Sequence, residues 1–188
     1  VGLVTYLDME TLSSGKLGDL SGRGNGGQLF GTSDTAGKIG RARNFDGAID
    51  YVKIANSPSL TLGSFTYTGW VRRGVFSGVW DVILFKGAVN AQGFGLLISN
   101  AGRLYSYFGL TNVISPASIP INSWAFVAVT INQSSVNGGN CIYIDGNLSI
   151  CGALATQAVS NTNITIAATL TKEGAWANQN MSGTIDEV

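Results

Sequence analysis

Apolar and polar residues alternate with a period of two along most of the chain, and no segment sustains the helical period of about 3.6 residues. The apolar stretches are short and rich in Val, Ile, Thr, Tyr, Phe and Trp, and clusters of Gly, Asn and Ser separate them as turns separate strands. Both faces of Trp124–Ile131 are apolar enough to be covered, which is typical of a central strand. The pattern predicts an all-β fold, a two-sheet antiparallel β-sandwich of jelly-roll type.

The predicted strands follow one another without a linker that would divide the chain, so we expect a single domain over residues 1–188. The longest stretch without a strand pattern is the glycine-rich segment 9–40. So long a loop in a compact domain is more often functional or packed over a sheet than free. Strands are expected at residues 2–7, 42–45, 49–54, 65–73, 80–85, 94–99, 103–108, 124–131, 141–144, 148–151, 164–167 and 183–188.

Composition excludes several classes of function. The chain has no histidine, which removes Ser-His-Asp and Cys-His nucleophile activation and the commonest zinc ligand. Only 12% of residues are charged, with 11 Lys+Arg against 11 Asp+Glu, so no basic field exists for nucleic acid or an anionic membrane surface. No apolar run is long enough for a transmembrane helix. We therefore expect no nucleic-acid partner and no membrane insertion.

Two cysteines flank a strong turn signal, Asp-Gly at 145–146, which tolerates the positive φ of a tight hairpin. A two-residue turn would set Cys141 opposite Ile150 and send Cys151 to the other face of the sheet. A three-residue turn, with Asn147 in the left-handed region, would set Cys141 opposite Cys151 and permit a disulfide. We favour the disulfide. The alternative is that both cysteines are buried free thiols.

Low charge, a polar uncharged bias and paired cysteines are typical of secreted or cell-surface proteins. Asn-x-Ser/Thr sequons agree with this, although chance also produces them in a chain rich in Asn and Ser. We expect an extracellular or cell-surface location. The glycosylation candidates are Asn132, Asn147, Asn163 and Asn180.

Aromatic residues in loop-like segments suggest a sugar site. A sugar ring packs its C–H face on an indole, and Asn or Gln side chains bind its hydroxyls. Trp176 lies in sequence beside Asn178, Gln179 and Asn180, and Trp80 follows a second glycine-containing loop. The alternative is that a loop tryptophan simply caps the core.

Carboxylates are scattered singly, without the close acidic pair of a retaining glycosidase. Asp8 directly follows the first predicted strand and Asp186 lies in the last, and these strands are often neighbours in a sandwich. Such carboxylates can bind Ca²⁺. The alternative is that they are exposed to solvent and bind no ion.

The order of short motifs resembles the laminin-G-like, concanavalin A-type jelly-roll domains. The most specific pieces are Asn-Phe-Asp-Gly at 44–47, Trp-Ala-Phe-Val-Ala-Val-Thr at 124–130 and Ser-Gly-Thr-Ile-Asp-Glu-Val at 182–188. Further matching pieces lie in order at residues 3–8, 19–22, 39–40, 50–52, 64–66, 70–71, 83–87 and 142–146.

The resemblance implies two stacked sheets and carbohydrate binding or adhesion more often than catalysis. It also implies a structural calcium between the first strand and the last, at Asp8 and Asp186, with Asp19 a weaker candidate. Among enzymes that share the fold, the laminarinase-like hydrolases carry a Glu-x-Asp-x-x-Glu motif on one strand, which the chain lacks, so we expect no enzymatic activity. Such domains also continue their last strand a few residues beyond the position of Val188.

Two functions remain in competition. The first is a non-catalytic carbohydrate-binding or adhesion module, with a glycan or glycoprotein as its partner. The second is a structural or adhesive subunit of an extracellular assembly that acts through protein–protein contacts, including self-association through sheet edges. The fold alone does not separate them.

Overall fold

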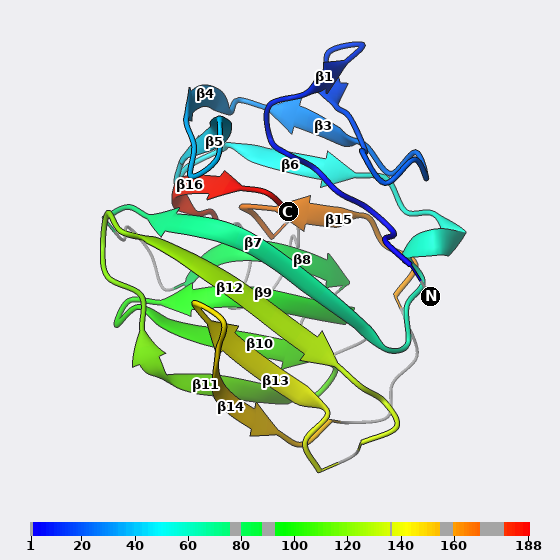
Figure 1. Cartoon of the computed structure of the whole chain (residues 1–188), viewed down its shortest axis with the longest axis vertical. Helices are drawn as coiled ribbons and strands as arrows, with labels where there is room; N and C mark the ends of the chain where they lie inside the picture. The colour runs from blue at the N-terminus through cyan, green and yellow to red at the C-terminus, as the bar shows by residue number, and fades with distance from the viewer. Residues whose placement is uncertain (1, 76–79, 88–92, 136, 155–159, 170–178) are drawn as a thin grey trace.

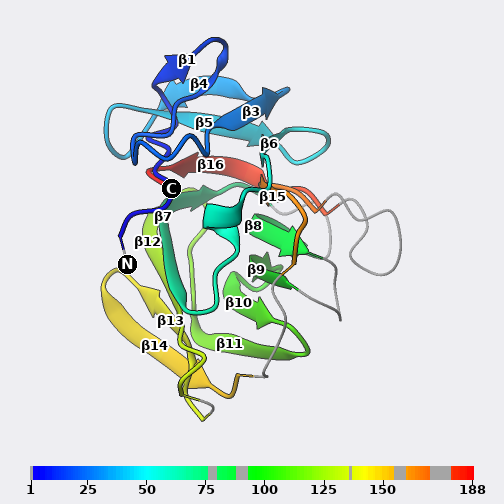
Figure 2. The ribbon, with the colours of Figure 1, turned by 90° about the vertical axis from the view of Figure 1, so that its right-hand side faces the viewer.

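The computed structural model describes residues 2–75, 80–87, 93–135, 137–154, 160–169 and 179–188. These residues form two antiparallel sheets that stack face to face (Figure 1; Figure 2). The predicted all-β jelly-roll sandwich is confirmed. One short 3-10 helix, η1, spans Pro58–Leu60.

The nine-stranded sheet lies behind the other in Figure 1 and has β15 at its centre. Its order is β1 (Leu12–Ser13), β2 (Lys16–Leu17), β3 (Gly27–Phe30), β6 (Tyr51–Ile54), β15 (Ile164–Ile166), β8 (Trp80–Gly87), β9 (Gly93–Ser99), β10 (Arg103–Phe108) and β11 (Thr111–Ser118).

The seven-stranded sheet has β7 at its centre. Its order is β14 (Asn147–Gly152), β13 (Asn140–Ile144), β12 (Trp124–Ile131), β7 (Phe65–Arg73), β16 (Ser182–Asp186), β5 (Arg41–Asp46) and β4 (Ser33–Ala36).

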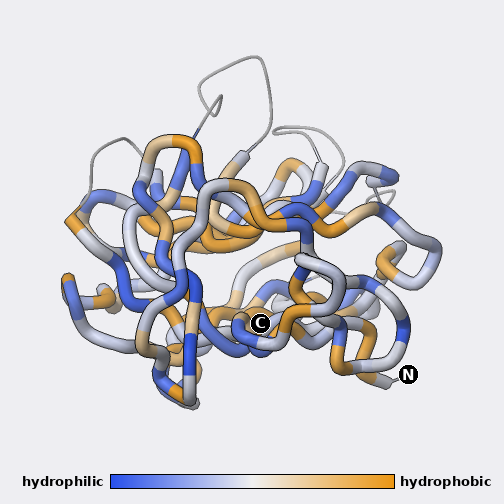
Figure 3. Tube along the Cα trace, turned by 90° about the horizontal axis from the view of Figure 1, so that it is seen from above, coloured by the Kyte–Doolittle hydropathy of each residue, from blue (hydrophilic) through white to orange (hydrophobic). Residues whose placement is uncertain are grey.

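The core lies between the sheets, where alternate side chains of each strand meet. In β12, Ala125, Val127 and Val129 are buried, whereas Trp124 and Phe126 on the other face are half-buried. The outer face of this strand is therefore only partly covered, less than the sequence predicted. Seen from above, the two layers lie one over the other (Figure 3).

The strand predictions at 65–73, 103–108 and 124–131 match β7, β10 and β12. The glycine-rich segment 9–40 instead contains β1 to β4, which form sheet edges. Strand β11 was not among the predicted strands, and its Pro116 is tolerated because β11 is an edge strand.

The two ends of the chain lie side by side, as predicted for a jelly roll. The backbone of Leu7 donates to Val188 at 2.6 Å and accepts from it at 2.9 Å. The hydroxyl of Tyr6 donates to the carboxylate of Glu187. This bond raises the pKa of Tyr6 to about 12, and burial and the charge of Glu187 add to it.

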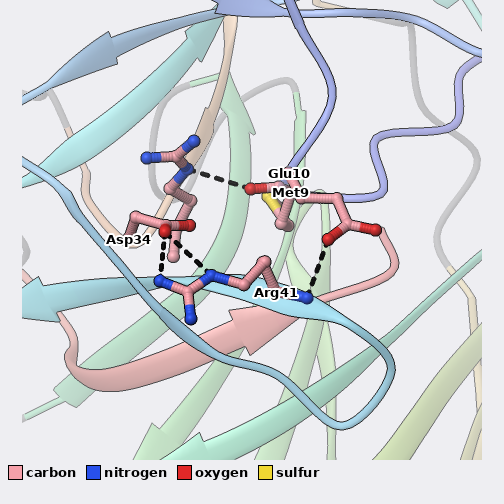
Figure 4. Close-up of polar contacts among 5 residues, drawn as sticks. Met9, Glu10, Asp34 and Arg41 are labelled. Atoms are coloured by element: carbon pink, nitrogen blue, oxygen red, sulfur yellow. Dashed lines mark hydrogen bonds and ion pairs between the residues drawn. The ribbon is translucent and has the colours of Figure 1, made fainter.

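Polar contacts hold the segment after Leu7 against β4 and β5 (Figure 4). The guanidinium of Arg43 donates to the carbonyl of Met9 at 2.9 Å, in a buried position. The backbone N–H of Arg41 donates to the carboxylate of Glu10 at 2.8 Å, and the Arg41 side chain pairs with Asp34. The Arg41–Asp34 pair is exposed and contributes little, so the buried Arg43 contact is the stronger anchor.

Cys141 and Cys151 form the predicted disulfide and lie directly opposite each other, 4.1 Å apart between Cα atoms. The predicted three-residue turn is wrong. Asp145 and Gly146 both have positive φ, and Ile144 pairs with Asn147 across a two-residue turn. A β-bulge then places an extra residue, Ser149, in β14. The bulge shifts the register by one residue and brings the cysteines to the same face.

Candidate functional site

A second apolar cluster lies on the face of the nine-stranded sheet that points away from the core. Strand β9 shows the division, since Leu96 and Ile98 belong to the core whereas Leu97 between them belongs to the second cluster. Side chains of β8 and β10 join Leu97. We call this group the Trp80 cluster, and it consists of Trp80, Val82, Phe85, Leu97, Tyr105 and Tyr107.

Strand register places these side chains in two rows. Leu97 pairs with Val82 on one side and with Tyr105 on the other, and Gly95 pairs in the same way with Phe85 and Tyr107. The rings of Phe85 and Tyr107 lie almost parallel across Gly95, with centroids 6.3 Å apart. A Cβ on Gly95 would lie 2.8 Å from the Phe85 ring, so this ring position requires glycine there.

Trp80 and Tyr105 form the accessible end of the cluster. Both are half-buried, whereas Val82, Phe85, Leu97 and Tyr107 are at most 6% exposed. The ring centroids of Trp80 and Tyr105 lie 5.0 Å apart, and the planes are inclined at 53°. Burial raises the pKa of the Tyr105 hydroxyl, and a hydrogen bond with Asn112 opposes this shift.

Gln179 brings an amide group to the same place. Its side-chain oxygen accepts the backbone N–H of Trp80 at 3.1 Å. Gln179 is held in turn by Thr169, whose N–H donates to the Gln179 carbonyl at 2.9 Å and whose hydroxyl accepts the Gln179 N–H at 3.2 Å. Two angled aromatic rings beside an anchored amide can pack on the apolar face of a small polar ligand and bind its hydroxyls.

The structure thus brings together two of the predicted ligand residues, Trp80 and Gln179. Trp176 and Asn178 lie outside the described residues. Asn180 points elsewhere, because its side-chain amide donates to the carbonyl of Ala48. The sequence reading missed Tyr105, although the alternation of Arg103–Phe108 already placed both of its tyrosines on one face.

Two buried ionisable side chains lie near this site: Asp81 follows Trp80 in β8, and Arg73 is the last residue of β7. Asp81 is 1% exposed and Arg73 is 6% exposed. Burial raises the pKa of Asp81 to about 6, although a hydrogen bond from the Ser182 N–H and the charge of Arg73 lower it. One carboxylate oxygen of Asp81 and two guanidinium nitrogens of Arg73 have no hydrogen-bond partner within the described residues.

The carboxylates of the predicted calcium ligands differ in the hydrogen bonds that they already accept. The Asp8 carboxylate accepts the N–H groups of Glu10 and Thr11 and the Thr11 hydroxyl. Asp19 accepts three backbone N–H groups, which lower its pKa together with a side-chain hydrogen bond from Ser21, against the opposing effect of burial.

Asp186 is different. One of its oxygens accepts the N–H groups of Lys38 and Ile39, and the other is buried without a partner in the part of the chain that the structure describes. No group of three acidic or cysteine side chains with metal-binding geometry occurs among the described residues. Asp186 therefore has an oxygen without a partner for the predicted ion, whereas both oxygens of Asp8 and of Asp19 already accept hydrogen bonds, and the calcium site stays a prediction.

Three of the four sequon asparagines, Asn132, Asn147 and Asn163, are exposed. In N-glycosylation the glycan is attached to the side-chain nitrogen of Asn. In Asn147 this nitrogen donates a hydrogen bond to the carbonyl of Asp145. In Asn132 and Asn163 the side-chain oxygen is the atom that makes the recorded hydrogen bonds. These two positions are therefore the better candidates for a glycan.

Similar folds occur in carbohydrate-active and receptor-binding proteins. Domain 4 of AbnA, an extracellular arabinanase of Geobacillus stearothermophilus in complex with arabinotriose, aligns with a TM-score of 0.73 and 15% identity over 98% of this chain and 89% of that domain. The sialidase of Trypanosoma rangeli in complex with sialic acid aligns with a TM-score of 0.69 and 12% identity over 97% of this chain.

The receptor binding domain of botulinum neurotoxin C/D mosaic serotype aligns with a TM-score of 0.69 and 15% identity over 98% of this chain. The chain spans only 29% of the sialidase and 46% of the neurotoxin domain, and at these identities the likeness concerns the fold. No curated protein matches in sequence.

A family model supplies the assignment that the distant structures do not. The model described as concanavalin A-like lectin/glucanases superfamily matches residues 46–188, which include most of both sheets and the whole Trp80 cluster. The chain belongs to the concanavalin A-like lectin/glucanase superfamily.

Proposed function

We propose that the chain is a non-catalytic carbohydrate-binding or adhesion module, and that its ligand packs on Trp80 and Tyr105. The observation that carries the proposal is this pair of half-buried rings, inclined at 53° beside the anchored amide of Gln179. A glycan is the ligand class that needs both an apolar stacking surface and nearby hydrogen-bonding groups. The arabinotriose complex of the similar AbnA domain supports this choice.

The absence of catalysis is part of the proposal. Hydrolysis of a glycosidic bond commonly uses two carboxyl groups on either side of that bond. Asp81 has the raised pKa of a potential acid, but within the described part of the chain the charge that acts on it is that of Arg73, and no second carboxylate there contributes. The chain has no histidine to take the second role.

An extracellular or cell-surface location agrees with the disulfide and with the exposed sequons. No helix among the described residues is long and apolar enough to cross a membrane.

A glycan array tests the proposal with four proteins. Wild type should bind a defined set of glycans, and Trp80→Ala should weaken that binding by about tenfold or more, as removal of a central aromatic contact does. Trp124→Ala is the matched control, because Trp124 is also half-buried but lies on the outer face of the seven-stranded sheet. Trp176→Ala tests whether the second predicted tryptophan belongs to the same site.

Melting temperatures of all four proteins separate loss of the site from loss of the fold. Binding that is absent in wild type, or unchanged in Trp80→Ala, would overturn the proposal.

The second candidate, a subunit of an extracellular assembly, is favoured by one observation. Strand β4 is an edge strand of the seven-stranded sheet with three of its four residues exposed, and an exposed edge strand can pair with another chain. Concentration-dependent oligomers in light scattering, together with a blank glycan array, would favour this function over glycan binding.

A further inference from the structure

A cation lies beside the Trp80 cluster on the outer face of the nine-stranded sheet. Arg103 is the first residue of β10 and is exposed. Leu104 points into the core, whereas Tyr105 belongs to the Trp80 cluster. Because alternate residues of a strand share a face, Arg103 leaves the sheet on the same side as Tyr105, about 7 Å from it along the strand. The proposed glycan site therefore has a guanidinium at its border.

Strand pairing brings Arg103 to the same end of the site as Trp80. Trp80 pairs with Ser99 of β9. The N–H of Arg103 donates to the Ser99 hydroxyl at 3.2 Å, and the N–H of Gly102 donates to the Ser99 carbonyl at 2.8 Å in the turn between β9 and β10. Trp80, Ser99 and Arg103 thus form a row across three neighbouring strands, whose order can be followed in Figure 1. At about 4.8 Å per strand, the backbones of Trp80 and Arg103 are roughly 10 Å apart.

One hydrogen bond orients the guanidinium of Arg103. Its Nε donates to the carbonyl of Ser115 in β11 at 2.6 Å, where the pairing of β10 with β11 shifts between Arg103 and Tyr105. The two terminal nitrogens have no hydrogen bond or ion pair with any residue that the structure describes. A guanidinium fixed in this way presents a planar fork of N–H donors, which matches the oxygens of a carboxylate or a sulfate group.

The charge of Arg103 is not balanced by a carboxylate on its face of the sheet, as far as the nine described strands extend. These strands contain one carboxylate, Asp81. Asp81 pairs with Ile98, which belongs to the core, and it is 1% exposed, so it lies on the inner face. The border of the Trp80 cluster at Arg103 is therefore positively charged, which is complementary to an anionic ligand.

We infer that the glycan bound at Trp80 and Tyr105 is acidic, and that Arg103 binds its carboxylate or sulfate group. This inference rests on the proposed function and names the class of glycan. The sugar ring packs on the two aromatic rings, and its anionic substituent reaches the guanidinium past Ser99. The charged hydrogen bonds add specificity to a stacking contact that is open to most sugars. The alternative is that Arg103 only supports the irregular pairing of β10 with β11 through Ser115.

The test compares the affinities of the chain for glycans in matched pairs that differ in an anionic group. Sialyllactose is titrated against lactose, galacturonate oligomers against galactose oligomers of the same linkage, and galactose sulfate against galactose. Wild type should bind the acidic member of at least one pair about three- to tenfold more tightly at low ionic strength, as an exposed but bidentate ion pair allows. A preference in either of the first two pairs identifies a carboxylate, and a preference in the third identifies a sulfate.

Ionic strength separates ligand binding by Arg103 from its role in strand pairing. The preference of wild type for the acidic glycan should disappear as the salt concentration rises, because salt screens an exposed charge pair. The affinity for the neutral glycan should change little. This readout needs no variant, so it does not depend on how a substitution affects the fold.

Two variants assign the preference to one cation. Arg103→Gln should bind both members of each pair equally, within about twofold of the wild-type affinity for the neutral member. Lys53→Gln is the matched control and should keep the wild-type preference. Lys53 is half-buried on the same face of the sheet, but it lies in β6, two strands from β8, over the ring of Phe30. Circular dichroism checks that both variants are folded.

Three results would overturn the inference. Equal affinities of wild type for acidic and neutral glycans would overturn it and leave the proposed function standing. A preference that survives in folded Arg103→Gln, or that is lost in Lys53→Gln, would do the same. Binding of neither kind of glycan would overturn both the inference and the proposed function.

Discussion

Trp80 and Tyr105 meet with ring centroids 5.0 Å apart although they come from strands that are not adjacent, β8 and β10. Strand β9 separates them, and Leu97 is the residue of β9 that pairs with Tyr105. Buried Leu97 belongs to the apolar cluster against which both half-buried rings pack. The site is therefore built on three paired strands, which are more rigid supports than loops.

Asp81 predicts a pH dependence of stability. Its folded pKa of about 6 lies above its usual value of 3.8, so its contribution is fully present below pH 4 and is lost as the pH rises through about 6. We expect Asp81→Asn to be more stable than wild type at pH 8 by about 1–3 kcal/mol, and equal to it near pH 3.5. Urea denaturation of both proteins at the two pH values measures this. A wild type that gains stability relative to the variant between pH 4 and pH 8 would contradict it.

Removal of the disulfide is expected to lower the free energy of unfolding. Opening the short loop between Cys141 and Cys151 should cost about 2–3 kcal/mol, because the unfolded chain regains freedom. The double variant Cys141→Ser/Cys151→Ser measures this in denaturant. Intact mass after alkylation without reductant checks the bond itself, and two added alkyl groups would show that it does not form in solution.

Calcium gives a third prediction. If an ion binds at Asp186 and Asp8, the melting temperature should be higher in calcium than in chelator, because a ligand that binds only the folded state stabilises it. Asp186→Asn should remove the difference, since the Asp186 oxygen without a partner is the available ligand. Equal midpoints for wild type in calcium and chelator would exclude a stabilising ion.

The sequence predicted the inner architecture well and the edges poorly. Long apolar strands such as Phe65–Arg73 and Trp124–Ile131 were found at their full length, since burial on one face enforces the alternation. The short edge strands before residue 40 and the Pro116-containing strand β11 carry little apolar pattern, because solvent covers much of them.

The sequence did not predict which residues pair across neighbouring strands. The disulfide was predicted correctly for the wrong reason, because nothing in the residues distinguishes the bulge at Ser149 from a three-residue turn. The candidate site shows the same limit. Trp80 and Gln179 were named from chemistry alone, but Tyr105 joins them only through the pairing of β8, β9 and β10.

The most direct test of the account is a nuclear magnetic resonance titration that follows the indole N–H signals of the four tryptophans. Arabinotriose, sialic acid and the strongest ligands from the glycan array are the probes. The account predicts that the Trp80 signal shifts in a saturable manner with at least one of these glycans, while the signals of Trp70 and Trp124 on the seven-stranded sheet stay in place. A stationary Trp80 signal with every probe, or a shift confined to Trp70 and Trp124, would contradict it.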